Sequence, residues 1–177
     1  LRRAGVDVLA DRSGVGANLH DHPMTTIAYG TSRKDTFKAA ETPQNLIRYL
    51  VRRTGPLASN IAEAIAFARS SPELKAPDIE LLFAPLHWNE QALKPPDYHG
   101  FTIGAALLAP VSRGKISLGE KPDGPPHIDF GFFADAKGSD KAVMLAAMRL
   151  AHRVAGAAPL KSMISRDMDG HPWAGAE

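Results

Sequence analysis

The sequence of 177 residues lacks cysteine, has no long apolar run and carries little excess charge. Without cysteine there is no disulfide framework, no thiolate nucleophile and no cysteine-based zinc site. No apolar stretch approaches the roughly 20 residues that a membrane-spanning helix needs, and no signal-peptide pattern opens the chain. The formal net charge of +2 is too small to indicate a nucleic-acid partner. What remains is an ordinary globular composition. The absence of cysteine leaves the compartment undecided, and we take a cytoplasmic location as the working expectation.

Two segments have the apolar spacing of helices. The first follows Thr42, a good N-cap residue, and stops at the Gly-Pro pair 55–56. Its apolar stripe consists of Leu46, Ile47, Leu50 and Val51. The second and longest helix begins at Ser139 or Asp140 and ends before Pro159. We expect it to bury a stripe made up of Val143, Met144, Ala147, Leu150, Ala151 and Val154.

Strand-like runs dominate the middle of the chain. They span residues 6–9, 24–29, 78–84, 101–109, 115–118 and 127–133. A tight turn at 112–114 predicts a hairpin between 101–109 and 115–118, with 127–133 as an edge strand. The major helices stand apart from these strands, without regular βαβ alternation. The predicted fold class is therefore α+β, an antiparallel sheet with helices on one face.

The segment 60–69 is ambiguous between helix and strand. Every even position from 62 to 68 is alanine, which favours a helix, but the alternation of large and small side chains favours a strand. We predict a strand whose alanine face packs closely and whose other face projects Glu63 beside Ile65 and Phe67. A buried carboxylate there would be costly unless paired, and its pKa would shift. The residues alone favour a solvated glutamate or an ion pair with an arginine such as Arg69.

The segment 14–23, GVGANLHDHP, raises several alternatives. A dinucleotide-binding turn would need a third glycine where Leu19 stands, and a helix directly after it. A metal site on His20 and His22 would need further ligands, and no other histidine lies near in sequence, so we expect none. The ordinary role, favoured for Asp21, is a hydrogen bond to the turning backbone. Serine hydrolysis is poorly supported, because the chain has no G-x-S-x-G elbow.

Aromatic residues form a second group of candidates. Phe83 and Trp88 stand near the end of a predicted strand and in the loop after it. Such side chains could line an apolar pocket. Core or rim packing is the commoner role, and the residues alone favour it.

Six blocks of the chain resemble, in order, those of the glucose-methanol-choline (GMC) flavin oxidoreductases. Residues 1–6 and 14–23 resemble the lead-in LRALGI and the signature GVGxNLxDHP, and 55–67 resemble GPLASN..EAGGF. The strand at 77–80 is similar to PDxQ, PVSRGKISL at 110–118 to PxSRGxVxL, and 126–129 to PxIDPxY. The helix at 140–155 resembles the one that follows in the family. The similarity covers nearly the whole chain.

The resemblance implies a substrate domain built on a six-stranded antiparallel sheet. In this family an N-terminal FAD domain binds the flavin, which accepts a hydride from an alcohol. The family's active-site histidine lies in a later HPxGT region. Because Trp173 follows Pro172 here, His171 is not assigned that role and no catalytic residue is expected in this chain.

The domain organisation follows from the same resemblance. The chain begins at Leu1 without a methionine, so we read it as a segment of a longer product. We expect residues 1–177 to form one substrate-binding domain, with 1–23 near the boundary to the FAD domain of the same polypeptide. Alone it would be inactive and would not retain FAD. The surface left exposed predicts association between copies.

Few residue roles carry over from the family. Glu63 aligns with a glutamate that faces the cationic head of the substrate in choline-oxidising members, but Ile61 and Ala62 provide no aromatic cage, so choline is not favoured. The residues expected to bind a small alcohol are Glu63, Phe67, Phe83 and Trp88. Those expected near the flavin are Asn18, Asp21 and His22. The alternative is a stand-alone ligand-binding or interaction module without catalysis, which would have no need of the loop on the flavin side.

Overall fold

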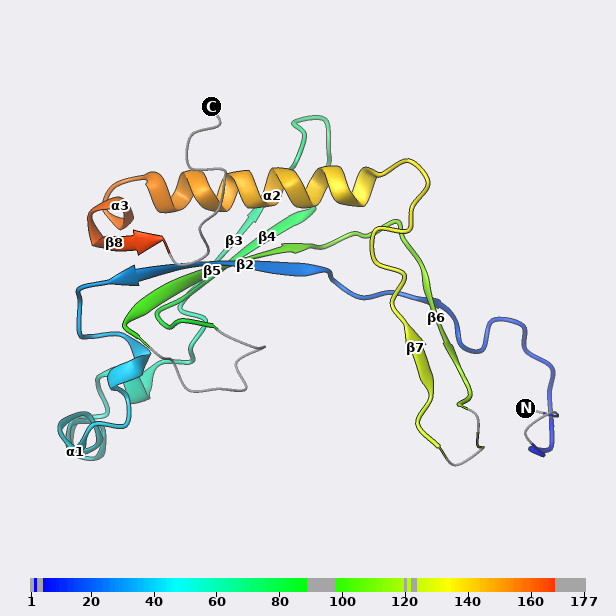
Figure 1. The fold of residues 1–177 in the computed structure, drawn as a ribbon, viewed down its shortest axis with the longest axis horizontal. Helices are drawn as coiled ribbons and strands as arrows, with labels where there is room; N and C mark the ends of the chain where they lie inside the picture. The colour runs from blue at the N-terminus through cyan, green and yellow to red at the C-terminus, as the bar shows by residue number, and fades with distance from the viewer. Residues whose placement is uncertain (1, 3–4, 89–97, 120, 122–123, 168–177) are drawn as a thin grey trace. The chain divides into compact units, whose positions relative to one another are not determined.

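The computed structural model describes residues 2, 5–88, 98–119, 121 and 124–167 (Figure 1). Its backbone contacts divide the chain into two compact units. Unit 1 contains residues 1–23 and 109–142, and unit 2 contains residues 24–108 and 143–177. Each unit has an antiparallel sheet of its own. None of the described helices combines the length and the apolar character needed to cross a bilayer.

The sheet of unit 2 has five strands in the order β3-β4-β5-β2-β8. Its strands are β2 (Met24–Thr31), β3 (Ala64–Ala68), β4 (Ile79–Ala84), β5 (Gly100–Leu107) and β8 (Ile164–Asp167). Every neighbouring pair is antiparallel. The central strand β5 is buried along its whole length and lies between β4 and β2. The strands predicted at 24–29, 60–69, 78–84 and 101–109 are confirmed, whereas β8 was not predicted. The predicted close packing of the alanine face of 60–69 is wrong, because Ala64 and Ala66 of the edge strand β3 are exposed and only Ala68 reaches the core.

Helix α2 (Ser139–Gly156) lies along one face of this sheet (Figure 1). Ala147, Ala151 and Ala155 recur every four residues and are 0–1% exposed against a core that includes Leu81 and Ile103. Their small side chains let the helix approach the strands closely. The predicted stripe is confirmed except at Val154, which is 39% exposed. Ala155 takes its place because it continues the four-residue spacing.

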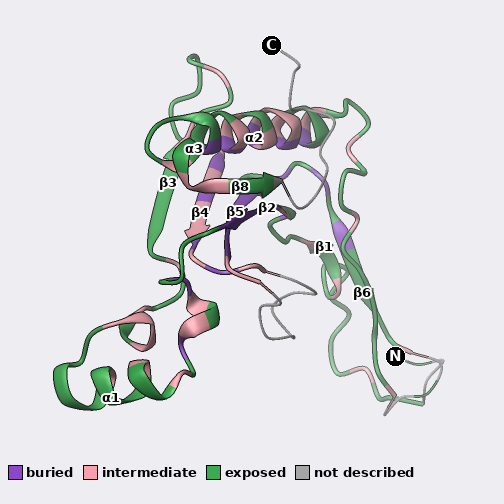
Figure 2. Cartoon of the chain, turned by 60° about the vertical axis from the view of Figure 1, so that its left-hand side comes forward, coloured by how far each residue is buried: buried purple, intermediate pink, exposed green. Residues whose placement is uncertain are grey.

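The remaining helices of unit 2 are short. Helix α1 (Pro43–Arg52) begins after the N-cap residue Thr42, as predicted. It stands between the 3-10 turns η2 (Phe37–Ala39) and η3 (Pro56–Ala58), and α3 (Leu160–Met163) precedes β8. None of the residues of α1 is buried, and Figure 2 draws the helix largely in the colour of exposed residues.

The sheet of unit 1 has three strands in the order β1-β6-β7. They are β1 (Ala17–Leu19), β6 (Gly114–Ser117) and β7 (His127–Asp129). The predicted edge strand is confirmed in β7, which is shorter than the predicted 127–133. No strand forms at 6–9.

The predicted hairpin between 101–109 and 115–118 is wrong. Strand β5 pairs with β2 and β4, whereas β6 pairs with β1 and β7. The ladder cannot continue from one run to the other, since Pro110 has no N–H and the N–H groups of Val111 and Ser112 donate to the carboxylate of Asp140. The α+β class with antiparallel sheets is confirmed, but the strands divide into five and three, not a single set of six.

Candidate functional site

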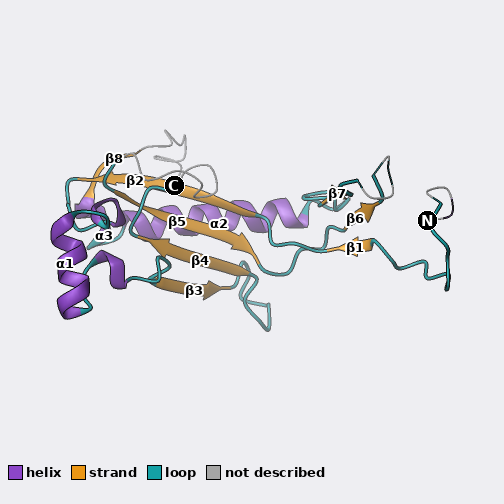
Figure 3. Cartoon of the chain, turned by 90° about the horizontal axis from the view of Figure 1, so that it is seen from below, coloured by secondary structure: helices purple, strands orange, loops and turns teal. Residues whose placement is uncertain are grey.

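One face of the five-stranded sheet is covered by α2, and the other face carries the predicted substrate residues. Side chains alternate along a strand, so the residues beside those of the core point away from α2. Figure 3 shows this face from below, with α2 behind the strands. We call it the open face.

Cross-strand register places the side chains of the open face in rows. In one row Met24 of β2, Ala106 of β5, Glu80 of β4 and Phe67 of β3 stand side by side. The next row contains Thr26, Gly104, Leu82 and Ile65. The central strand contributes only the small residues Gly104 and Ala106, whereas Met24, Ile65 and Phe67 on either side are 51–60% exposed. The open face is therefore a low apolar floor between larger side chains.

Glu63 extends this arrangement at the start of β3. Its N–H donates to the carbonyl of Phe83 (3.0 Å), which continues the ladder by one residue. By strand alternation its carboxylate stands on the same side as Ile65 and Phe67. The side chain is exposed, in agreement with the solvated alternative. Arg69 is engaged elsewhere, since its guanidinium donates to two carbonyl oxygens of the loop that follows β3.

Trp88 reaches the open face through its backbone. Its N–H donates to Thr102 Oγ1 (3.0 Å), and that hydroxyl donates to the carbonyl of Leu86 (2.7 Å). Thr102 belongs to β5 and is 2% exposed. This buried hydroxyl holds the segment after β4 on the open face.

Phe83 lies on the other side of the sheet. It packs against the core beneath α2, with its ring centroid 5.5 Å from that of Phe101. The structure thus brings Glu63, Phe67 and Trp88 to one face and separates Phe83 from them.

Sequence reasoning missed several residues of the open face. The alternation of β4 puts Ile79, Leu81 and Phe83 in the core, so its partner face, with Glu80 and Leu82, could have been found from the same pattern. Met24 and Gly104 could not, because only the pairing of β2 and β4 with β5 brings them beside these side chains.

In unit 1, the predicted cofactor residues Asn18, Asp21 and His22 are all exposed. The Asp21 carboxylate accepts the N–H of His22 (2.8 Å), which confirms its role in the turning backbone. Asn18 has a left-handed φ of 58°. Among the described residues no group of three His, Asp or Glu is placed to hold a metal ion.

The glycines of this segment have a structural role. Gly16 has a φ of 78°, and a Cβ atom there would lie 2.3 Å from the carbonyl oxygen of Ile116. Only glycine permits β1 to approach β6 so closely. A strand follows Gly16, so no helix N-terminus is presented to a phosphate and a dinucleotide-binding turn is excluded at this position.

The SRG block at 112–114 is also structural. The Asp140 carboxylate accepts the N–H groups of Val111 and Ser112 (2.8 Å each), and the N–H of Asp135 donates to Ser112 Oγ (3.0 Å). Arg113 donates to the three carbonyl groups of residues 110–112. Together these bonds join the segment before β6 to the start of α2.

Both carboxylates of this network are held ionised. The hydrogen bond from Ser139 lowers the pKa of Asp135. Burial opposes ionisation of Asp140, but the hydrogen bonds from Ser112 and Val111 outweigh it, so its pKa also lies below the ordinary value.

Comparisons with known proteins cover nearly the whole chain. No family model matches it. An uncharacterised GMC-type oxidoreductase of Mycobacterium tuberculosis is 44% identical over 165 residues, which are 93% of this chain and 31% of that protein. An oxygen-dependent choline dehydrogenase of Rhizobium johnstonii is 35% identical over 147 residues, 80% of this chain and 27% of that protein. The chain spans about a third of the length of the curated relatives it matches.

A solved structure agrees with the fold. A formate oxidase of Aspergillus oryzae, determined to study modification of its FAD, superposes with a TM-score of 0.77 at 21% identity. The superposition covers 97% of this chain and 35% of that one.

Proposed function

Because this chain belongs to the GMC oxidoreductase family and spans about a third of its relatives, we propose that it is the substrate-binding domain of an FAD-dependent oxidoreductase that acts on the CH–OH group of a small alcohol. In this proposal residues 1–177 act as one domain, with 1–23 near the boundary to the FAD domain. The parent enzyme works in the cytoplasm, which cell fractionation tests. The isolated chain is inactive and does not retain FAD.

The open face is the observation that carries the proposal. Its apolar floor of Gly104 and Ala106 suits the carbon skeleton of an alcohol, and it excludes water from that part of the substrate. Phe67 and Trp88 bound the substrate, and Glu63 orients its polar end by accepting a hydrogen bond. Phe83 supports the site from the core instead of lining it.

The residues present fit an edge contact with FAD but not a complete FAD site. The exposed side chains of Asn18, Asp21 and His22 offer polar atoms, whereas the strand after Gly16 rules out a phosphate-binding turn there. When bound by the rest of the parent, the flavin accepts the hydride from the carbinol carbon. The base that takes the hydroxyl proton is supplied from outside this chain.

The composition of unit 1 supports a partner in the same polypeptide. Every buried Ala, Ile, Leu, Met, Phe and Tyr among the described residues lies in unit 2. Unit 1 instead exposes apolar side chains by 38–100%, including Val15, Ile128 and Phe132. Such a surface is suited to packing against another domain. In its absence, copies of the isolated chain associate with one another.

The first test is an absorbance spectrum of the full-length parent, followed by a panel of primary alcohols that includes choline. We expect a flavin spectrum that one or more alcohols bleach. A colourless protein that stays colourless after FAD is added would overturn the proposal and favour the binding module.

A second test assigns the open face. Phe67→Ala in the parent should raise KM at least about tenfold with little change in kcat, because it removes contacts present in both ground and transition states. Glu63→Gln should raise KM less, since an amide oxygen still accepts a hydrogen bond. Leu74→Ala, in the exposed loop between β3 and β4, is the control and should leave both constants unchanged. Equal effects of all three substitutions on KM would show that the open face is not part of the substrate site.

A further inference from the structure

Glu80 places a carboxylate inside the open face. The residue belongs to β4, and the cross-strand register puts Ala106 of β5 on one side of it and Phe67 of β3 on the other. Leu82, two residues further along β4, points to the same face and is also apolar. Glu80 is half-buried among these neighbours. A carboxylate that is partly removed from water on an apolar surface is costly unless a hydrogen-bond donor or a cation compensates it.

Nothing compensates Glu80 within the part of the chain that the structure describes. The residue forms neither a hydrogen bond nor an ion pair with any described residue. Asp78, two residues earlier, differs because its carboxylate accepts the N–H (2.7 Å) and the hydroxyl of Ser70. Arg69, on the neighbouring strand segment, donates to carbonyl groups of its own loop instead. Glu80 therefore keeps its full capacity to accept hydrogen bonds.

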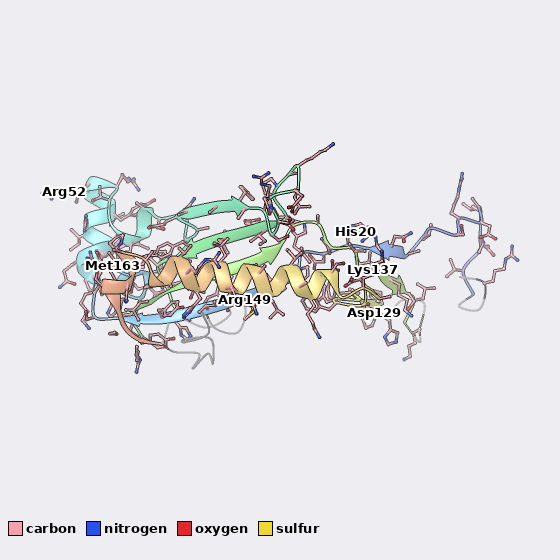
Figure 4. The ribbon with its side chains drawn as sticks, turned by 90° about the horizontal axis from the view of Figure 1, so that it is seen from above. His20, Arg52, Asp129, Lys137, Arg149 and Met163 are labelled. Carbon is pink, nitrogen blue, oxygen red and sulfur yellow. The ribbon has the colours of Figure 1, made fainter. Side chains whose placement is uncertain are left out.

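The basic residues of the five-stranded sheet and of α2 are remote from Glu80. Arg166 of β8 pairs with Gly30 of β2. Gly30 stands six positions along β2 from Met24, and Met24 shares the row of Glu80. At about 3.3 Å per residue, the rows of Arg166 and Glu80 are roughly 20 Å apart. Arg149, labelled in Figure 4, belongs to α2 on the opposite side of the sheet. Neither arginine neutralises the Glu80 carboxylate.

We propose that Glu80 binds a protonated amine of the substrate, so that the parent enzyme oxidises amino alcohols. This inference rests on the proposed function of the open face. A carboxylate accepts hydrogen bonds and donates none, whereas a protonated amine donates N–H groups and carries the opposite charge. The carbon chain lies over the small residues Ala106 and Gly104. In the reaction the amine is unchanged: the carbinol carbon loses a hydride to the flavin and the hydroxyl loses its proton to a base, which gives an amino aldehyde.

A quaternary ammonium group fits this position less well. It has no N–H to donate, and proteins hold such a cation against the faces of several aromatic rings. Of the two cross-strand neighbours of Glu80, only Phe67 is aromatic. The substrate amine therefore carries at least one N–H, which separates this inference from choline oxidation.

A basic side chain from the rest of the parent is the other candidate partner of Glu80. Placed over Glu80, it would also cover the adjoining floor at Ala106, which the proposed substrate occupies. A substrate amine satisfies the carboxylate without blocking the face. It also makes the site selective, since a neutral alcohol of the same length leaves the carboxylate of Glu80 unpaired.

The test compares amino alcohols with neutral alcohols of the same length in the full-length parent, beginning with ethanolamine and propanol. We expect kcat/KM to be at least about tenfold higher for ethanolamine, because propanol cannot form the charge-assisted hydrogen bond. Glu80→Gln should lower this ratio about tenfold, and Glu80→Asp should retain part of it. Glu41→Gln is the control, since this exposed carboxylate lies outside the strands of the open face and its loss changes the net charge equally.

Four results would overturn the inference. If propanol is oxidised as efficiently as ethanolamine, the substrate is not an amino alcohol, although the proposed function stands. If choline is oxidised as efficiently as ethanolamine, no N–H is required. If Glu80→Gln leaves the ratio unchanged, Glu80 does not bind the amine, and an accompanying loss of thermal stability would assign it to a basic side chain of the parent. A parent whose flavin no alcohol bleaches would overturn the proposed function as well.

Discussion

The two sheets of this protein are stabilised in different ways. In unit 2, buried aliphatic and aromatic side chains such as Leu81, Phe101 and Ile103 pack under the alanines of α2. Among the described residues of unit 1, the buried side chains with hydrogen-bonding groups are Ser112 and Asp140, and none belongs to the hydrophobic core. Hydrophobic burial therefore dominates one unit, and close backbone approach and ionised carboxylates dominate the other.

This difference explains the residue types of two family-like motifs in unit 1. The signature at 14–23 and the SRG block at 112–114 contain glycine, aspartate and serine, which are residues that invite a catalytic interpretation. In the structure Gly16 permits close approach of β1 to β6, and Ser112 is tied to the start of α2. A small sheet without its own core depends on a few such contacts, so they form recognisable sequence motifs.

The largest effect should come from the core of unit 2. Leu81 is 6% exposed beneath α2, so Leu81→Ala should lower the free energy of unfolding by about 2–5 kcal/mol in urea denaturation. Ile65→Ala, on the open face of the neighbouring strand, should cost less than about 1 kcal/mol. Comparable losses would mean that the open face is also packed.

The next largest loss of stability should come from unit 1, where Gly16 closely approaches the carbonyl oxygen of Ile116. Gly16→Ala introduces a Cβ atom 2.3 Å from a carbonyl oxygen at a left-handed φ. The strain should destabilise β1 by about 1–3 kcal/mol, detected as faster hydrogen exchange of the Ile116 amide, which donates to Gly16 O. Gly14→Ala is a matched control, since nothing lies within 4 Å of its added Cβ. Equal exchange rates in the two variants would contradict this role for Gly16.

Acid should weaken unit 1 selectively. The folded-state pKa values of Asp135 and Asp140 lie below 3.8, the ordinary value they regain on unfolding. Their contribution is therefore complete above about pH 4 and is lost as the pH falls through the lower folded values. Asp140→Asn should cost about 1–3 kcal/mol at neutral pH and reduce this pH dependence. Amide hydrogen exchange at about pH 3 and pH 7 measures the two units separately. Between the two pH values, β6 of unit 1 should lose more protection than β5 of unit 2. A greater loss of protection in β5 than in β6 would contradict the selective effect of acid on unit 1.

The smallest effect should come from α1. Leu50 belongs to the exposed apolar stripe of this helix, so Leu50→Ala should change the free energy of unfolding by no more than about 0.5 kcal/mol. Thermal unfolding of the two proteins side by side measures this. A loss near that of Leu81→Ala would show that the stripe is covered within the chain.

Particular elements show how far sequence reasoning reached. The alternation of large side chains with alanine at 60–69 correctly favoured a strand over the helix that alanine propensity suggests, but β3 is an edge strand whose Ala64 and Ala66 are exposed, and only Ala68 packs against the core. The turn signal at 112–114 led to a wrong hairpin, since a competing bond to Asp140 comes from a residue 28 positions away. Phe83 was grouped with Phe67 as an aromatic candidate, but pairing of β3 with β4 places them on opposite faces.

The sequence by itself determined the GMC membership, most strand and helix positions and the apolar periodicity of both major helices, because these depend on local residue patterns. The tertiary structure alone decided which face each pattern turns to the core. Ala151 is covered and Leu50 is exposed although both belong to a helical apolar stripe. The difference arises from long-range pairing and from the hydrogen bonds of Asn45 and Arg48, which no local pattern specifies.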